Sequence, residues 1–218
     1  MSKELFEFDE NFNNFIIGTD EAGRGPGAGG VFASAVYFPE KSEKLISELE
    51  ILNDSKKLTS KKRESIYDVI LNNTINSIVC VEVEEIERIN ILNASLKAMK
   101  LACEEVASKI NAENKNILVL VDGNKLIKDF KIPQKYIIKG DSKSASIAAA
   151  SILAKVTRDR YMNELSLKYP QYGWDKNAGY LTKSHLEAID KYGVTPYHRL
   201  SFLKKHFAKN EQLKLFIK

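Results

Sequence analysis

Four acidic residues follow short apolar runs of the chain, and carboxylates placed in this way could bind metal ions or transfer protons. Asp20 and Glu21 follow the run FIIGT, Asp122 follows ILVLV, and Asp141 follows YIIK and Gly140. Short β-branched runs closed by Gly or Asp are typical of strands buried on both faces of a sheet. Because open α/β sheets carry functional groups at the carboxyl ends of their strands, the four carboxylates could meet in one place.

A cluster of carboxylates predicts a metal site. Like charges a few Å apart raise each other's pKa, so the cluster would not stay fully ionised without cations. Carboxylate oxygens are hard ligands that select Mg²⁺ or Mn²⁺. The expected chemistry is that of a metal-dependent phosphodiesterase. Any one of the four acids, taken alone, is equally compatible with a turn or a helix cap.

The size and composition of the chain indicate one α/β core with at most a small appendage. It has 218 residues, of which 44% are hydrophobic and 28% charged, and a formal net charge of +4. A mild surplus of Lys and Arg around an acidic centre suits a polyanionic substrate. Cys80 and Cys103 lie far apart in apolar segments and are typical of buried thiols. With neither a targeting segment nor a membrane span, we expect a cytoplasmic protein.

Apolar periodicity predicts the elements that must position the acids. Strands are expected at residues 15–19, 31–38, 75–83, 117–121 and 135–139. Helices are expected at residues 42–52, from about Thr59, at 94–110 with Asn93 as cap, from Ser144 to about Leu167, at 185–191 and at 199–209. This order predicts an α/β protein with a mixed five-stranded sheet flanked by helices and a C-terminal helical extension.

The segment from Gly25 to Gly30 matches the pattern GxGxxG after a strand. A dinucleotide fingerprint would require a helix to begin here, whereas VFASAVYF at residues 31–38 alternates like a strand. We therefore expect these glycines to allow close approach of a ligand to the backbone beside Arg24. A nucleotide-dependent α/β enzyme is kept as a rival hypothesis.

The chain as a whole resembles bacterial ribonuclease HII, within the type 2 ribonucleases H. The matching blocks occur in family order from about residue 15 to 207: GTDEAGRGP, LNDSKKLT, ILNASLKAM, LVDGN, KGDSKSASIAAASILAKVTRD, GYLTKSH and HRLSF. The resemblance implies an RNase H-like fold with a catalytic core at residues 15–168. We expect an N-terminal extension at 1–14, a helical substrate-binding region at 169–210 and a tail at 211–218.

The same resemblance implies an endoribonuclease that acts on RNA–DNA hybrids in ribonucleotide excision repair and DNA replication. It would also cut on the 5′ side of ribonucleotides embedded in duplex DNA, leaving a 3′-hydroxyl and a 5′-phosphate. Asp20, Glu21, Asp122 and Asp141 would be the catalytic, metal-binding acids. They would hold two divalent ions, Mn²⁺ or Mg²⁺, about 4 Å apart on the scissile phosphate. We expect a monomer. The rival from another class is a nucleic-acid-binding scaffold without catalysis.

Further site residues are implied by the matching blocks. Backbone amides of Gly23, Arg24 and Gly25 would contact the 2′-hydroxyl, which alone distinguishes RNA from DNA at one nucleotide. Tyr180 would stack at the RNA–DNA junction. The candidate phosphate contacts are Lys56, Lys57 and Lys143.

Four positions depart from the usual family pattern. Gly27 stands where a leucine is usual, and Gly30 stands where a proline is usual. Leu181 replaces a usual glycine, and Leu200 replaces a usual arginine. Because extra glycine loosens a loop, we expect looser positioning of Arg24 and an effect on substrate affinity.

The tail QLKLF is similar to the peptide by which bacterial replication proteins dock on the sliding clamp. In that hypothesis Leu215 and Phe216 insert in an apolar pocket, and Gln212 bonds its rim. Leu213 completes the matching set. The alternative is that these leucines pack back on the protein itself.

Overall fold

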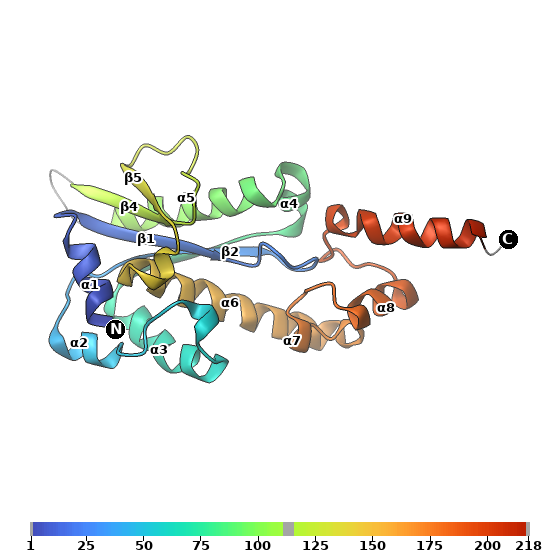
Figure 1. The fold of residues 1–218 in the computed structure, drawn as a ribbon, viewed down its shortest axis with the longest axis horizontal. Helices are drawn as coiled ribbons and strands as arrows, with labels where there is room; N and C mark the ends of the chain where they lie inside the picture. Colours follow the sequence, from blue (N-terminus) through green and yellow to red (C-terminus); the bar gives the residue numbers. More distant parts are fainter. Residues whose placement is uncertain (1, 111–115, 217–218) are drawn as a thin grey trace.

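The computed structural model describes residues 2–110 and 116–216, and the side chains of that part up to residue 209. Its centre is a five-stranded sheet with helices on both faces (Figure 1). The strands are β1 (Phe15–Ala22), β2 (Val31–Tyr37), β3 (Ile75–Val81), β4 (Ile117–Asp122) and β5 (Gln134–Ile137). Their order is β3-β2-β1-β4-β5, antiparallel on the β3 side of β1 and parallel from β1 to β5. The predicted mixed sheet is confirmed.

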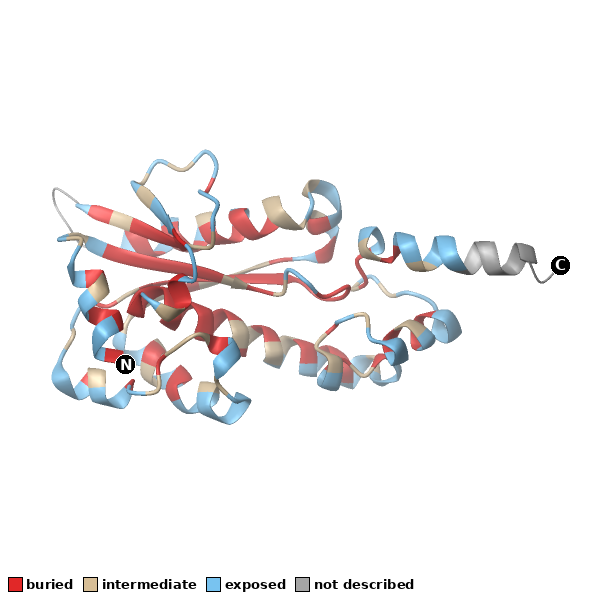
Figure 2. Ribbon diagram, in the orientation of Figure 1, coloured by how far each residue is buried: buried red, intermediate tan, exposed pale blue. Residues whose placement is uncertain are grey.

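Two layers of helices cover this sheet. The helices are α1 (Ser2–Glu10), α2 (Glu43–Glu48), α3 (Ser60–Asn73), α4 (Val83–Ile89), α5 (Ile91–Lys109), α6 (Ala145–Lys168), α7 (Trp174–Asn177), α8 (Lys183–Tyr192) and α9 (Leu200–Phe216). Helix α5 packs on one face, and α6, backed by α1 and α3, packs on the other. Figure 2 shows burial concentrated in β1, β2 and β4, on the inner side of α5 and in the first half of α6, where the apolar core lies.

Local signals set most of the element boundaries. Helices α3 and α6 begin where expected, and Thr59 and Ser144 cap them, each accepting a hydrogen bond from a backbone N–H in the first turn. The prediction of Asn93 as a cap is wrong. Asn90 caps α5 instead, with φ of 65° and a side chain that accepts from the N–H of Asn93 at 3.1 Å. Asparagine tolerates this left-handed backbone better than most residues.

Other differences arise from packing that the sequence pattern does not reveal. The third strand ends at Val81 because helix α4, which was not predicted, begins at Val83. Helix α1 was not predicted either. Its buried Asp9 accepts hydrogen bonds from the N–H and Oγ of Ser146 at 2.9 and 2.8 Å, at the positive N-terminus of α6. The expected extension 1–14 therefore packs on the core.

The glycine segment leads into β2 and not into a helix. The requirement of a dinucleotide fingerprint is therefore not met. Both cysteines are free, as predicted, and Cys103 is fully buried whereas Cys80 is partly buried. No helix in the described part of the chain is long and apolar enough to cross a lipid bilayer.

A buried arginine from the C-terminal extension holds the glycine loop, which we define as residues 23–30. Arg199 is fully buried and donates to the carbonyl of Gly29 at 2.7 and 2.9 Å. It also donates to the carbonyls of Pro26 at 2.8 Å and Arg24 at 3.3 Å. Carbonyl dipoles thus offset its charge, and the extension is fixed to the core through this loop.

A second buried arginine, Arg158 on α6, also binds the glycine loop. Arg158 donates to the carbonyls of Ala28 and Ala178 at 3.1 Å and of Gly30 at 3.3 Å. Gly23 has φ of 99°, and a Cβ there would lie 2.2 Å from the Arg158 Nε. The backbone at residue 23 can therefore contact the guanidinium of Arg158 only because glycine has no side chain.

Replacing Arg158 by lysine should lower the free energy of unfolding by about 2–4 kcal/mol. Lysine keeps the charge but lacks the planar fork that reaches three carbonyls, so buried acceptors lose their donors. Urea unfolding of the purified protein measures the change.

Arg160→Lys, on the same helix, is the matched control. Arg160 is exposed and pairs with Glu64, so its replacement should cost less than about 1 kcal/mol. Equal losses in the two variants would contradict the structural role of Arg158.

Candidate active site

The register of β1 on β4 brings two of the four acids together. The strands are parallel, with Thr19 opposite Val121, so Asp20 and Asp122 follow as the next residues of neighbouring strands. Alternation along the strands turns both side chains to the face covered by α6. The adjacency expected from the two apolar runs is therefore present in the structure.

Asp122 also delivers the third acid. Its Oδ1 accepts a hydrogen bond from the N–H of Gly140 at 2.7 Å, which fixes the short helix η2 (Gly140–Ser142) that carries Asp141. A Cβ at residue 140 would lie 3.2 Å from this oxygen and 2.5 Å from the Cδ1 of Ile147. A side chain here would have to displace Ile147, so the glycine lets this segment lie close against Asp122.

Glu21 approaches from the other face of β1, because consecutive strand residues point to opposite sides. Its Oε1 accepts from Arg24 at 3.3 Å. The four acids are close enough to interact through their charges, but their side chains do not converge on one point. Within the described residues, no three His, Cys, Asp or Glu side chains are arranged to hold a metal ion.

The acids nevertheless interact strongly through their charges. Burial, and then the charges of Glu21, Asp122 and Asp141, raise the pKa of Asp20 well above its ordinary value. Burial, with Asp122 and Asp54, raises the pKa of Asp141 to about 6. A set of carboxylate oxygens under mutual repulsion is the kind of donor set that hard divalent cations stabilise. The residues present fit such ions in their chemistry.

A cavity of about 440 Å³ opens beside Asp20 and Glu21. Its lining combines acids, glycine backbone and cations: Asp20, Glu21, Ala22, Gly23, Arg24, Gly25, Ser55, Lys56, Arg63, Lys155, Arg158 and Tyr180. Burial acts to lower the pKa of Lys56, but the carboxylates, Asp20 and Asp141 foremost, outweigh it and the pKa is raised. Lys56 is therefore held charged at the edge of the acidic centre.

The three predicted phosphate-contacting lysines do not lie together. Lys56 lines the cavity of the acids, whereas Lys57 and Lys143 line a neighbouring hollow of about 390 Å³. Tyr180 is half-exposed, and its ring lies against Gly25, where a Cβ would be 3.2 Å from the Tyr180 Cε1. The predicted glycine and tyrosine contacts thus share one wall.

Two of the four departures from the family pattern meet in space. A Cβ on Gly27 would lie 2.5 Å from the Cδ2 of Leu181, so the leucine fills the room that the glycine leaves. A Cβ on Gly30 would lie 2.6 Å from the Sγ of Cys80. Leu200 is half-exposed at the start of α9. The extra glycines are therefore packed against neighbours.

Three arginines of this region were not singled out by the sequence. Arg158 and Arg199 support the glycine loop. Arg63 donates to the carbonyls of Ser55 at 2.8 Å and Leu58 at 2.6 Å and so holds η1 (Ser55–Lys57), the short helix that carries Lys56. In the sequence, each is an arginine in a polar stretch. Arg158 and Arg199 fall in two of the matching blocks, but nothing in the sequence shows that these arginines are buried.

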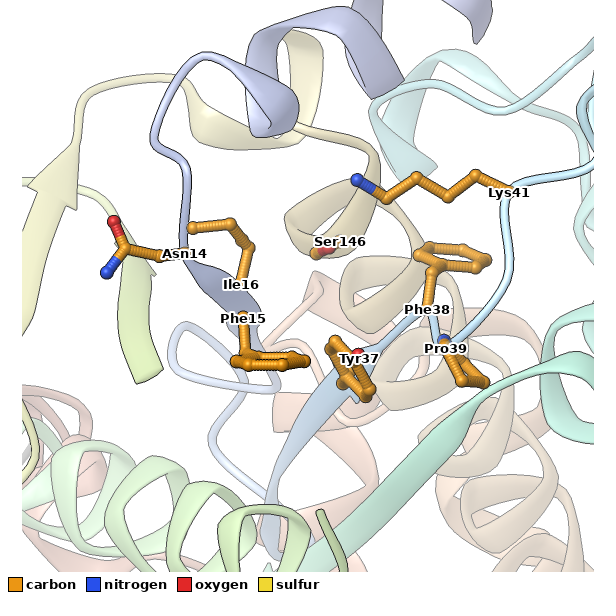
Figure 3. Close-up of a pocket in the computed structure, with 8 residues that line it drawn as sticks. All are labelled: Asn14, Phe15, Ile16, Tyr37, Phe38, Pro39, Lys41 and Ser146. Atoms are coloured by element: carbon orange, nitrogen blue, oxygen red, sulfur yellow. The ribbon is translucent and has the colours of Figure 1, made fainter. Parts of the chain in front are cut away.

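A separate hollow of about 310 Å³ lies at the other end of β1 (Figure 3). Phe15, Tyr37 and Lys41 are among the side chains around it, and the rings of Phe15 and Tyr37 are 5.9 Å apart. No residue predicted for the site lines it. The side chains of the tail, Gln212, Leu213, Leu215 and Phe216, lie outside the described residues.

The repulsion among the acids predicts that the metal-free protein is stabilised by neutralising Asp20. Asp20→Asn should raise the melting temperature in EDTA at pH 7 by about 3 °C, because it removes a buried charge beside like charges. Differential scanning calorimetry measures this. Asp68→Asn, on the exposed face of α3, is the control and should leave the value unchanged.

The pH dependence has a definite sign. The folded-state pKa of Asp141, about 6, exceeds the unfolded value of about 3.9. The contribution of Asp141 to the free energy of unfolding is therefore fully present below the unfolded pKa and is lost as pH rises through the folded pKa. The stability of the metal-free protein relative to an Asp141→Asn variant, in which the same histidines titrate, should therefore fall between about pH 4 and pH 7. A rise over this interval, or a less stable Asp20→Asn, would contradict the picture.

Comparison with known proteins shows the family to which the chain belongs. The family model "Ribonuclease HII" matches residues 17–209. A curated Ribonuclease HII of Fusobacterium nucleatum subsp. nucleatum is 49% identical over 213 residues, which is 97% of this chain and 96% of that protein.

Solved structures agree as well. The ribonuclease H2 of Pyrococcus horikoshii OT3 superposes with a TM-score of 0.65 at 27% identity, over 85% of this chain and 92% of that one. The PCNA:RNase HII complex of Archaeoglobus fulgidus also gives 0.65, at 23% identity over 85% and 93%, and supports the fold alone. With the family model covering the sheet, the acids and the extension alike, the chain belongs to the ribonuclease HII family.

Proposed function

We propose that this ribonuclease H cuts the phosphodiester bond on the 5′ side of a ribonucleotide embedded in duplex DNA, as well as the RNA strand of RNA–DNA hybrids. The products would be a 3′-hydroxyl and a 5′-phosphate. The observation that carries the proposal is the mutual electrostatic repulsion of Asp20, Glu21, Asp122 and Asp141. A binding scaffold would have no use for such a concentration of negative charge facing a nucleic acid.

Enzymes of this family depend on divalent metal ions. In the proposed site Asp20, Glu21, Asp122 and Asp141 would hold two of them, Mg²⁺ or Mn²⁺. When bound, such ions supply a water of lowered pKa and neutralise charge on the phosphate and leaving oxygen. The protein side chains orient this set: Arg24 holds Glu21, and Asp122 anchors the segment of Asp141.

Substrate selection would come from the wall opposite the acids. The amides of Gly23, Arg24 and Gly25 can approach a 2′-hydroxyl because two of the three residues lack a side chain. Tyr180 lies against this segment with half of its surface exposed, ready to stack on a nucleotide. Lys56 would hold a phosphate close to the acids.

The proposed substrate surface continues away from the acids. Lys57 and Lys143 line the adjacent hollow and would contact phosphates farther along the strand. The region 169–210 would carry the duplex beyond Tyr180. The boundaries of this region, like that of the core at 15–168, are proposals drawn from the matching blocks.

A duplex that carries a single ribonucleotide tests the proposal. We expect one cut at its 5′ side with Mg²⁺ or Mn²⁺, none with EDTA, and none on an all-DNA duplex. Asp122→Asn should lower the rate at least about a thousandfold, while Asp68→Asn serves as the matched control. Metal-independent cutting, or an undiminished Asp122→Asn, would overturn the mechanism. Binding without any cutting would favour the scaffold, and saturable NAD or ATP binding would favour the nucleotide-dependent rival.

A second proposal concerns the tail. The archaeal relative named above was solved with PCNA. The sequence QLKLF, with Gln212, Leu213, Leu215 and Phe216, would dock on the sliding clamp in a similar complex. Deleting residues 211–218 should weaken clamp binding at least about tenfold by surface plasmon resonance, with cleavage of short duplexes retained. Unchanged clamp affinity would remove the proposal.

A further inference from the structure

Two histidines lie buried in the C-terminal extension, outside the machinery described so far. His185 on α8 is fully buried, and His198 before α9 is 2% exposed. They pack among the rings of Tyr172 and Trp174. Their Nε2 atoms are 3.2 Å apart, and the other ring nitrogens face backbone groups. Two imidazoles in contact must arrange their protons so that a donor faces an acceptor.

The proton of His185 follows from its backbone partner. Its Nδ1 is 2.9 Å from the carbonyl oxygen of Tyr180, which can only accept. Nδ1 therefore carries the proton, and Nε2 of the neutral ring is bare. In agreement, the indole N–H of Trp174, which can only donate, points at Nε2 from 3.0 Å.

The proton of His198 follows from the opposite end. The backbone N–H of Thr195 donates to His198 Nδ1 at 2.9 Å, and the Thr195 hydroxyl lies at the same distance and can donate as well. Because the backbone N–H can only donate, Nδ1 is the acceptor and Nε2 carries the proton. His198 Nε2–H then faces the bare Nε2 of His185. The tautomer of His185, assigned from Tyr180, and that of His198, assigned from Thr195, thus place one donor and one acceptor at the contact between the two rings. One chain of donors thus runs from Thr195 through His198 and His185 to Tyr180.

An added proton would break this chain. Protonated His198 would turn a second donor against the N–H of Thr195, and protonated His185 would face Trp174 and His198 with an N–H. Burial lowers the pKa of both rings, that of His198 to about 4. The pair is therefore neutral at physiological pH, and each ring is held in one tautomer.

The backbone of Tyr180 is held from several sides. Its carbonyl accepts from the N–H of Thr182 at 2.8 Å as well as from His185, and its own N–H donates to Asn177 at 2.8 Å. The ring itself remains half-exposed. An exposed ring on a fixed backbone can stack without first paying the entropy of ordering its loop.

We infer that His185 is a positioning residue that fixes Tyr180 for its contact with the nucleic acid, and that His198 holds His185 in the tautomer required for this. The inference rests on the proposed function of Tyr180. The next residue after His198 is Arg199, which grips the glycine loop. One segment, 198–199, therefore supports both the glycine loop and Tyr180, which together form the wall of the proposed 2′-hydroxyl site.

The tautomers can be measured directly in the unaltered protein. Long-range ¹H–¹⁵N correlation spectra at pH 7 should show His185 protonated at Nδ1 and His198 at Nε2. Spectra of His185→Gln and His198→Gln assign the signals. The opposite tautomers, or an imidazolium at either position, would overturn the inference whatever the activity.

Two substitutions at His185 separate positioning from folding. Asparagine places an amide N–H near the position of Nδ1 and keeps the bond to Tyr180, but it leaves Trp174 and His198 without their acceptor. Glutamine reaches the position of Nε2 and keeps those two bonds, but it loses Tyr180. His185→Asn should therefore have the lower melting temperature, and His185→Gln the lower kcat/KM on a single-ribonucleotide duplex, by about fivefold. A purely structural role predicts that the less stable variant is also the less active one.

A double-mutant cycle with Tyr180→Ala completes the test. If His185 acts through the tyrosine, His185→Gln should cause no further loss once Tyr180 is gone. An unchanged fivefold loss in that background would overturn the inference and leave the function of Tyr180 standing. Full activity of Tyr180→Ala alone would overturn both roles, while metal-dependent cutting by the unaltered protein would still support the proposed reaction.

Discussion

The pairing of β1 with β4 decides where the acidic residues lie. Its parallel register makes Asp20 and Asp122 neighbours, and the burial that keeps Asp20 in place also disfavours its charged form. The buried acids destabilise this end of the sheet, and packing elsewhere in the sheet must offset the loss. It does so through apolar side chains on both faces of the two strands, among them the fully buried Ile17, Val119 and Leu120.

In the glycine loop the buried charges are positive, and backbone carbonyl groups offset them. The carbonyls of residues 24, 26, 28, 29 and 30 accept from Arg158 or Arg199, so these oxygens are turned into the protein. Carbonyls turned outward would face the phosphates of a nucleic acid with their negative ends. The buried guanidinium groups satisfy the backbone and also place positive charge beneath a surface proposed to bind a polyanion.

The sequence reveals features that depend on local spacing and leaves hidden those that depend on distant contacts. Thr59 and Ser144 cap their helices because a cap needs only the next three residues. Asp20 and Asp122 could be paired because each ends an apolar run. The separation of Lys57 from Lys56, two neighbours in sequence, depends on how η1 turns.

The same limit applies to the support of the site. Arg158 and Arg199 lie 41 positions apart in the chain, and only the folded structure shows that both are buried. The face toward which Glu21 points depends on strand alternation, which is hard to predict close to the end of a strand. The four acids could be listed from the sequence. Their burial, which raises the pKa of Asp20 and of Asp141, could not.

The departures from the family pattern acquire a meaning only in three dimensions. Taken singly, Gly27 loosens a loop and Leu181 adds bulk to another. Together they exchange a large and a small residue across one contact, because the leucine occupies the space that a side chain at residue 27 would need. Gly27 is held further by hydrogen bonds to Gly179 and Arg199. Leu181 thus fills the space that Gly27 leaves, and the loop is packed at this contact in spite of the extra glycine.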